Sequence, residues 1–175
     1  MKQLLSVWLV PEKEDENYLQ ELINTLGKEN NSPIFIPHLT LFGDIKIEFE
    51  ELKNAIDNVF ENIKPFKIKK TCVFQSELFF KTVFVEFKKS NLLTNLFENL
   101  EKETGEKKDV STFKPHISLM YKLMPEVEKL KIIKKHNIKD EFVIDRVFIN
   151  APGLGKKDFF DVNSWKTLYD KKLNH

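Results

Sequence analysis

One seven-residue pattern occurs twice in this chain, at residues 35–41 and 113–119. Both copies consist of an aromatic residue, any residue, Pro, His, an aliphatic residue, a hydroxyl residue and Leu. Successive side chains of a β-strand point to opposite faces, so each copy should present an imidazole and a hydroxyl on one face and aliphatic anchors on the other. Two such units facing one another would place two imidazoles and two hydroxyls around a single anion.

Hydrophobic periodicity in the rest of the chain predicts an α+β protein with two similar lobes, each a small sheet backed by helices. Strands are expected over residues 6–10, 34–42, 67–75, 78–87, 113–121, 142–149 and 165–169. Helices are expected over residues 14–27, 48–63, 92–102 and 125–135. Polar loops are expected over residues 104–111 and 150–161. No linker separates the halves, so residues 1–175 are expected to form a single domain of two lobes.

Composition restricts the classes of partner. Hydrophobic residues make up 41% of the 175 residues and charged residues 31%, which is typical of a globular protein. The net charge of +1, from 28 basic and 27 acidic residues, argues against a long nucleic acid as the partner. Arg146 is the only arginine. A bound phosphate should therefore be held by hydroxyls, imidazoles, backbone N–H groups or lysines rather than by guanidinium clamps.

Cysteine usage and the first residues indicate the setting. Cys72 is the only cysteine, which excludes an intrachain disulfide and indicates a cytoplasmic protein. Its position in an alternating apolar run predicts a small core residue. The apolar run before Pro11 is too short for a signal peptide or a spanning helix, so no membrane association is expected. We expect a monomer.

The histidine pair can be read as a metal site or as acid–base chemistry. Zinc would need further His, Cys, Asp or Glu ligands, whereas the motifs add only Thr40 and Ser118, so neither a metal nor another cofactor is expected. Imidazole has an ordinary pKa of about 6.5 and exchanges protons near neutral pH. His38 and His116 on opposite sides of one phosphorus could serve as general base and general acid. The hydroxyls would donate to the non-bridging oxygens as negative charge builds up.

The paired His-x-Thr/Ser motifs resemble the 2H phosphoesterase superfamily. Residues 6–11 (SVWLVP), residues 79–84 (FFKTVF) and Tyr121 after the second motif look like the cyclic nucleotide phosphodiesterases of plants and yeasts. The resemblance covers nearly the whole chain. It is weaker to the bacterial RNA 2′,5′ ligase branch, because the Arg-x-Phe pattern usual in the first strand of that branch is missing here.

This resemblance implies a bilobal fold, with two pseudo-symmetric antiparallel sheets around a central cleft. It implies metal-independent hydrolysis of ADP-ribose 1″,2″-cyclic phosphate and of nucleoside 2′,3′-cyclic phosphates to 2′-phosphates. His38 and His116 would be catalytic, and Thr40 and Ser118 would bind phosphate. Tyr121 would contact the substrate if the chain bends after the strand, since it otherwise faces away from Ser118. The sequence does not say which histidine is the base.

Weaker candidates and rival functions stay open at this point. Trp8 and Phe80, with Phe84 as a third choice, could stack on a base or fill the core. Residues 151–157 (APGLGKK) lack the spacing of a phosphate-binding loop and are expected to be solvated. One rival function is processing of short RNA ends that bear a 2′,3′-cyclic phosphate or a 2′,5′ linkage. Another is a nucleotide-binding module without catalysis.

Overall fold

The computed structural model describes residues 1–153 and 159–174. Its strands are β1 (Gln3–Pro11), β2 (Leu39–Ile47), β3 (Phe66–Gln75), β4 (Val83–Phe87), β5 (His116–Met120), β6 (Glu141–Ala151) and β7 (Lys166–Lys172). Its α-helices are α1 (Lys13–Asn30), α2 (Phe49–Val59), α3 (Asn91–Thr104), α4 (Glu126–Lys135) and α5 (Phe159–Val162). Short 3₁₀ helices lie at η1 (Phe79–Lys81) and η2 (Val110–Thr112).

The strands form one antiparallel sheet in the order β1-β2-β5-β4-β3-β6-β7, and β1 also pairs with β6. The long strand β6 belongs to both lobes. Its residues 141–144 pair with β3, whereas residues 146–151 lie between β1 and β7. The expected α+β fold is therefore confirmed, and its two sheets are halves of a continuous sheet. They meet at β6 and again where β2 pairs with β5.

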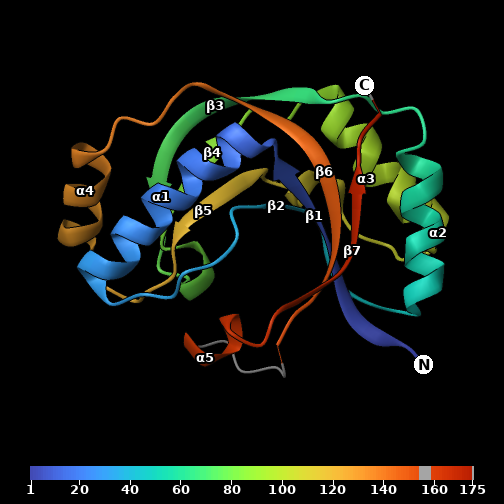
Figure 1. Cartoon of the computed structure of the whole chain (residues 1–175), viewed down its shortest axis with the longest axis horizontal. Coiled ribbons are helices and arrows are strands. Elements are labelled where there is room, and N and C mark those ends of the chain that lie inside the picture. Colours follow the sequence, from blue (N-terminus) through green and yellow to red (C-terminus); the bar gives the residue numbers. More distant parts are fainter. Residues whose placement is uncertain (154–158, 175) are drawn as a thin grey trace.

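Each lobe is covered by a helix that precedes the histidine strand of the other lobe in the chain (Figure 1). Helices α1 and α4 lie beside β3, β4 and β5, whereas α2 and α3 lie beside β1, β2 and β7. Helix α1 leads directly into β2 in the chain but packs on β5, and α3 leads toward β5 but packs on β2. Each helix thus supports the histidine strand that belongs to the other half of the chain.

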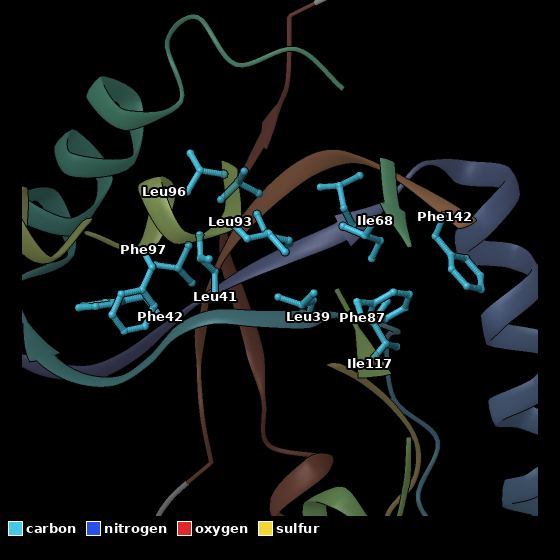
Figure 2. Close-up of a cluster of buried hydrophobic side chains, with 14 of the residues drawn as sticks. Leu39, Leu41, Phe42, Ile68, Phe87, Leu93, Leu96, Phe97, Ile117 and Phe142 are labelled. Carbon is cyan, nitrogen blue, oxygen red and sulfur yellow. The ribbon is translucent and has the colours of Figure 1, made fainter. Parts of the chain in front are cut away.

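One hydrophobic cluster extends through both lobes (Figure 2). Leu39 and Leu41 of β2 contribute to it from one lobe, and Ile117 of β5 and Phe87 of β4 contribute from the other. These side chains are at most 2% exposed, and full burial of each stabilises the fold by about 1.5–3 kcal/mol. The aliphatic positions of both motifs therefore anchor the strands, as strand alternation predicted.

The start of the first histidine strand was predicted wrongly. Residues 34–38 are not in a strand, and β2 begins at Leu39, one residue after His38. Pro33 and Pro37 explain the difference, because proline has no N–H to donate to a sheet ladder. The second motif behaves alike, since Pro115 precedes β5 and the strand begins at His116.

The expected strand over residues 78–87 also begins late. Residues Phe79–Lys81 form the 3₁₀ turn η1, and the strand starts at Val83. Thr82 is 1% exposed and its hydroxyl lies 3.0 Å from the Phe79 carbonyl and 2.8 Å from the Lys122 carbonyl. It also accepts a hydrogen bond from the Lys122 N–H at 2.9 Å. This hydroxyl ties η1 to the segment that follows β5.

Cys72 is exposed on β3 rather than buried in the core. The pairing of β3 with β4 slips between Lys70 and Cys72, where two steps along β3 match one step along β4. Such a bulge reverses the inward and outward alternation beyond it. Ile68 accordingly faces inward before the bulge and Val73 packs against the core after it, which leaves Cys72 outside.

The two expected loops differ in how fully they are described. Residues 105–115 form a loop that contains η2. In the second, β6 extends to Ala151 and α5 covers Phe159–Val162, while residues 154–158 of the expected solvated loop lie outside the described residues. None of the helices in the described part of the chain is both long and apolar enough to cross a bilayer.

Candidate active site

His38 is held from two sides. Its Nδ1 lies 2.6 Å from the backbone carbonyl of Ile36, two residues earlier in the proline-containing approach to β2. Its ring stacks on Trp8 of β1, with 3.5 Å between the ring centroids and 9° between the planes. Only 8% of the residue is exposed. These contacts set both the direction and the tilt of the imidazole.

His116 is held by the same backbone device. Its Nδ1 lies 2.8 Å from the carbonyl of Lys114, again two residues earlier and again across a proline. Its aromatic neighbour is Phe84 of β4, at 5.5 Å and 70°, so this contact is edge-on rather than stacked. The two histidines therefore share their hydrogen bonding but differ in their ring contacts.

The Nδ1 contacts decide the tautomer of both rings. A carbonyl oxygen can only accept a hydrogen bond, so Nδ1 of His38 and of His116 must carry the proton. In the neutral imidazole this leaves a lone pair on Nε2, and in the imidazolium it leaves an N–H there. Each Nε2 can consequently accept a proton or donate one, which is the requirement for acid–base work.

Sheet register relates the two motifs by an approximate twofold axis. Trp8 pairs with Thr40 across β1 and β2, and Phe84 pairs with Ser118 across β4 and β5. Each hydroxyl residue of a motif therefore has an aromatic residue as its cross-strand neighbour, and that aromatic ring also contacts the histidine of the same motif. Phe84 is in this sense the counterpart of Trp8.

Ser118 and Tyr121 form the polar wall next to His116. The Ser118 hydroxyl donates to the Phe80 carbonyl of η1 at 2.9 Å. β5 ends at Met120, so Tyr121 lies beyond the strand and turns back into the cleft, as its predicted role required. Its ring stacks on Phe35 at 3.7 Å and 13°. Burial raises the pKa of Tyr121, and the Ser118 hydroxyl that faces it offsets part of the rise.

One cleft of about 430 Å³ is lined by seven of the eight candidates from the sequence, and Phe84 is not part of its lining. Its lining includes Trp8, His38, Thr40, Phe80, His116, Ser118 and Tyr121. Trp8 is 5% exposed and one face of its ring is covered by His38, which favours a supporting role over stacking on a base. Phe80 is half-buried and lies open to the cleft beside Trp165.

Burial keeps both histidines neutral near pH 7. Burial lowers the pKa of His38 to about 4, the Ile36 carbonyl opposes the shift, and the charge of His116 adds to it. Burial likewise lowers the pKa of His116 to about 4, with the Lys114 carbonyl opposing and the Lys81 ammonium adding to the decrease.

Sequence reasoning missed several cleft residues. Lys81 is half-buried at the end of η1, and its Nζ lies 4.3 Å from the centroid of the Phe84 ring. Trp165 was expected within a strand but precedes β7 and packs edge-on against Trp8, with 5.4 Å between the ring centroids. Gly43 follows Thr40 in β2 and borders the cleft. The two phenylalanines that precede Lys81 in the sequence were the available signal for this residue. They did not indicate whether its side chain points into the cleft.

Backbone geometry explains why residue 43 is a glycine. β2 has an extra residue opposite Ser6, and Asp44 there has a φ of 54°, which marks a β-bulge. The Asp44 N–H donates to the Ser6 hydroxyl at 3.2 Å. A Cβ on Gly43 would lie 2.9 Å from Cγ2 of Thr40, so a side chain at this position would displace a residue of the cleft.

Solved structures show which known proteins share this fold. Escherichia coli LigT complexed with 3′-AMP aligns over 100% of both chains with a TM-score of 0.62 and 14% identity. TT0787 of Thermus thermophilus aligns over 99% of this chain and 98% of its own, with a TM-score of 0.64 and 17% identity. The fold is that of the LigT-type 2H phosphoesterases.

Sequence comparison shows the family of the chain. The family model described as cyclic phosphodiesterase-like protein matches residues 3–166, and the chain belongs to this family of phosphodiesterases. The cyclic phosphodiesterase of Arabidopsis thaliana is 26% identical over 176 residues, which cover 99% of this chain and 97% of the plant protein.

Proposed function

We propose that this phosphodiesterase hydrolyses small cyclic phosphodiesters by paired histidine acid–base catalysis. The substrates would be ADP-ribose 1″,2″-cyclic phosphate and nucleoside 2′,3′-cyclic phosphates, the latter opened to 2′-phosphates. The observation that carries the proposal is the matched geometry of His38 and His116. Both direct Nε2 away from a backbone carbonyl that holds Nδ1, and both line one cleft.

The chemistry balances without a covalent intermediate. A water oxygen attacks phosphorus while one Nε2 removes a proton from that water. The ester bond from phosphorus to the leaving oxygen breaks, and the second histidine, as imidazolium, gives its proton to that oxygen. One proton has then passed from one histidine to the leaving group and one from water to the other histidine. Exchange with solvent restores the starting protonation states.

Thr40 and Ser118 would stabilise the pentavalent transition state. Thr40 and Ser118 line the same cleft as the histidine pair. Hydroxyl donors gain strength as charge develops on the non-bridging oxygens. The Ser118 hydroxyl donates to the Phe80 carbonyl. The hydroxyl must therefore rotate toward the phosphate when substrate binds, and the Tyr121 side chain, which interacts with Ser118, would lie beside it.

The relatives support the same substrate class. The plant relative is named a cyclic phosphodiesterase, and LigT has been crystallised with 3′-AMP. The cleft of about 430 Å³ has the size of a pocket for a small ligand. RNA ends that bear a 2′,3′-cyclic phosphate remain the second candidate. A short RNA substrate in the same assay decides between them.

The deciding experiment compares the wild-type protein with His38→Gln and His116→Gln on three substrates. These are ADP-ribose 1″,2″-cyclic phosphate, uridine 2′,3′-cyclic phosphate and a short RNA with a cyclic end. Each substitution should lower kcat by at least roughly 10²-fold, the scale of one acid–base group. Phosphorus NMR should identify a 2′-phosphate product from uridine 2′,3′-cyclic phosphate, and activity should persist in EDTA. Near-normal turnover by either variant, or loss in EDTA with rescue by zinc, would overturn the mechanism.

A further inference from the structure

A second pocket of about 430 Å³ opens directly beside the active-site cleft. The two share four lining residues: Thr40, Gly43, Lys81 and His116. The second pocket continues along the loop between α3 and β5, with Lys108, Asp109, Thr112, Phe113 and Lys114 on its wall. A molecule with one group between the histidines can therefore extend into this pocket without leaving the protein surface.

The walls of this pocket are positively charged. Lys81, Lys108 and Lys114 line it, and none of their ammonium groups forms an ion pair with any residue in the described ranges. Asp109 is the acidic residue of the lining, and its Oδ1 already accepts a hydrogen bond from the Ser111 N–H at 2.8 Å. Lys81 interacts favourably with the charge of Glu86. Three ammonium groups around one pocket nevertheless repel one another, and a bound anion relieves that repulsion.

The lysine-bearing loop is held in place rather than hanging in solvent. The Lys108 N–H donates to Glu101 Oε1 of α3 at 3.2 Å, and the Thr112 hydroxyl donates to the Asp109 carbonyl at 2.7 Å. Phe113 packs on Phe97 of α3 with 5.2 Å between the ring centroids. Because the loop is already held in place, its lysines can bind an anion without a large loss of conformational entropy.

The two ends of the combined cavity differ in chemistry. Beyond His38 the cleft is aromatic, with Phe79, Phe80 and Trp165 in its lining. Beyond His116 it is basic, with Lys108 and Lys114. Aromatic side chains suit the flat, apolar faces of a base, and lysines suit phosphate oxygens.

We infer that the basic pocket is an anion subsite that binds a second phosphate group of the substrate. The inference rests on the proposed function, because it places the scissile cyclic phosphate between His38 and His116. It assigns a preference to the enzyme: cyclic phosphodiesters that carry a further phosphate or pyrophosphate are better substrates than those that carry none. Lys81 lies at the junction of the two pockets, and Lys108 and Lys114 contact the second phosphate.

The test compares uridine 2′,3′-cyclic phosphate with the same molecule bearing a 5′-phosphate. The measured quantity is the ratio of their kcat/KM values, which isolates the second phosphate from any change in basal turnover. For the wild-type protein the ratio should be about ten, the effect of one or two charge-assisted hydrogen bonds. It should approach one in the double variant Lys108→Ala/Lys114→Ala. It should also fall as NaCl rises from 0.1 to 1 M, because the screening length shortens from roughly 10 to 3 Å.

The matched control is Lys28→Ala/Lys131→Ala, which removes the same charge from exposed positions of α1 and α4. This control should keep the wild-type ratio. A ratio near one in the wild-type protein, or an equal ratio in both double variants, would overturn the subsite. Failure of the proposed function looks different, since the wild-type protein would then open neither substrate.

Two further substrates identify the source of the second phosphate. ADP-ribose 1″,2″-cyclic phosphate supplies it as a pyrophosphate, and a dinucleotide with a cyclic end supplies it as a diester. A lysine-dependent gain for the first alone assigns the subsite to small nucleotides. A gain for both extends it to short RNA ends, and a gain for neither counts against the inference.

Discussion

Leu39 of β2 pairs with Ile117 of β5 in antiparallel register, and this pairing joins the two histidine motifs. This pairing brings the two motifs together, and His38, Thr40, His116 and Ser118 all line the same cleft. The cleft is assembled from both halves of the chain, so neither half can form it alone.

The pH dependence of activity should differ between the free enzyme and the complex. Burial lowers the pKa of His38 and of His116 to about 4, below the ordinary 6.5, so the imidazolium needed as acid is scarce at neutral pH in the free enzyme. A bound phosphate anion favours the charged form and raises both pKa values. The optimum of kcat should thus lie at higher pH than that of kcat/KM. Profiles between pH 4 and 9 from single-turnover measurements test this, and coincident optima would contradict it.

The charge of Lys81 should lower the pKa of His116. Burial is the main cause of the low pKa of His116, and the Lys81 ammonium adds to it. Lys81→Met should therefore raise the pKa of His116, whereas Lys81→Arg, which keeps the charge, should leave it near the wild-type value. Proton NMR titration of the His116 ring measures the shift directly. A merely structural role for Lys81 would give no difference between the two variants.

Gly43→Ala should impair turnover by displacing Thr40. The new Cβ would lie 2.9 Å from Cγ2 of Thr40, so the hydroxyl on the same side chain must move. We expect kcat to fall about tenfold, the scale of one lost transition-state hydrogen bond. The double variant Gly43→Ala/Thr40→Ser removes the clashing methyl and keeps the hydroxyl, so it should recover most of the rate. Equal impairment of the single and double variants would show that the contact with Thr40 is not the cause.

Two variants of Tyr121 should distinguish the role of its ring from the role of its hydroxyl. Tyr121→Phe keeps the stack on Phe35 and removes the hydroxyl that faces Ser118. Its kcat should fall by about 3- to 10-fold with little change in the free energy of unfolding. Tyr121→Ala also removes a buried ring and should cost roughly 3 kcal/mol in urea unfolding. A kcat for Tyr121→Phe equal to that of the wild-type protein would exclude the hydroxyl from catalysis.

Prediction from sequence succeeded where the physics is local. A histidine and a hydroxyl two residues apart share one face of a strand, and the aliphatic residues between them face the core. Leu39 and Ile117 are buried as that rule requires. The same rule failed at Cys72, because a bulge in β3 reversed the alternation. It also missed Lys81, because η1 replaced the first part of an expected strand.

The sequence by itself determined which chemical groups the site contains: two imidazoles after prolines, two hydroxyls, and aliphatic anchors behind them. The tertiary structure decided which of these meet. Pairing of Leu39 with Ile117, the exchange of α1 and α3 between lobes and the 3₁₀ turn before β4 all depend on contacts between residues distant in the chain. Burial, which lowers both histidine pKa values, is likewise a property of the packed molecule. Alternation along a strand follows from backbone geometry alone, whereas cross-strand register and desolvation depend on what the rest of the chain places nearby.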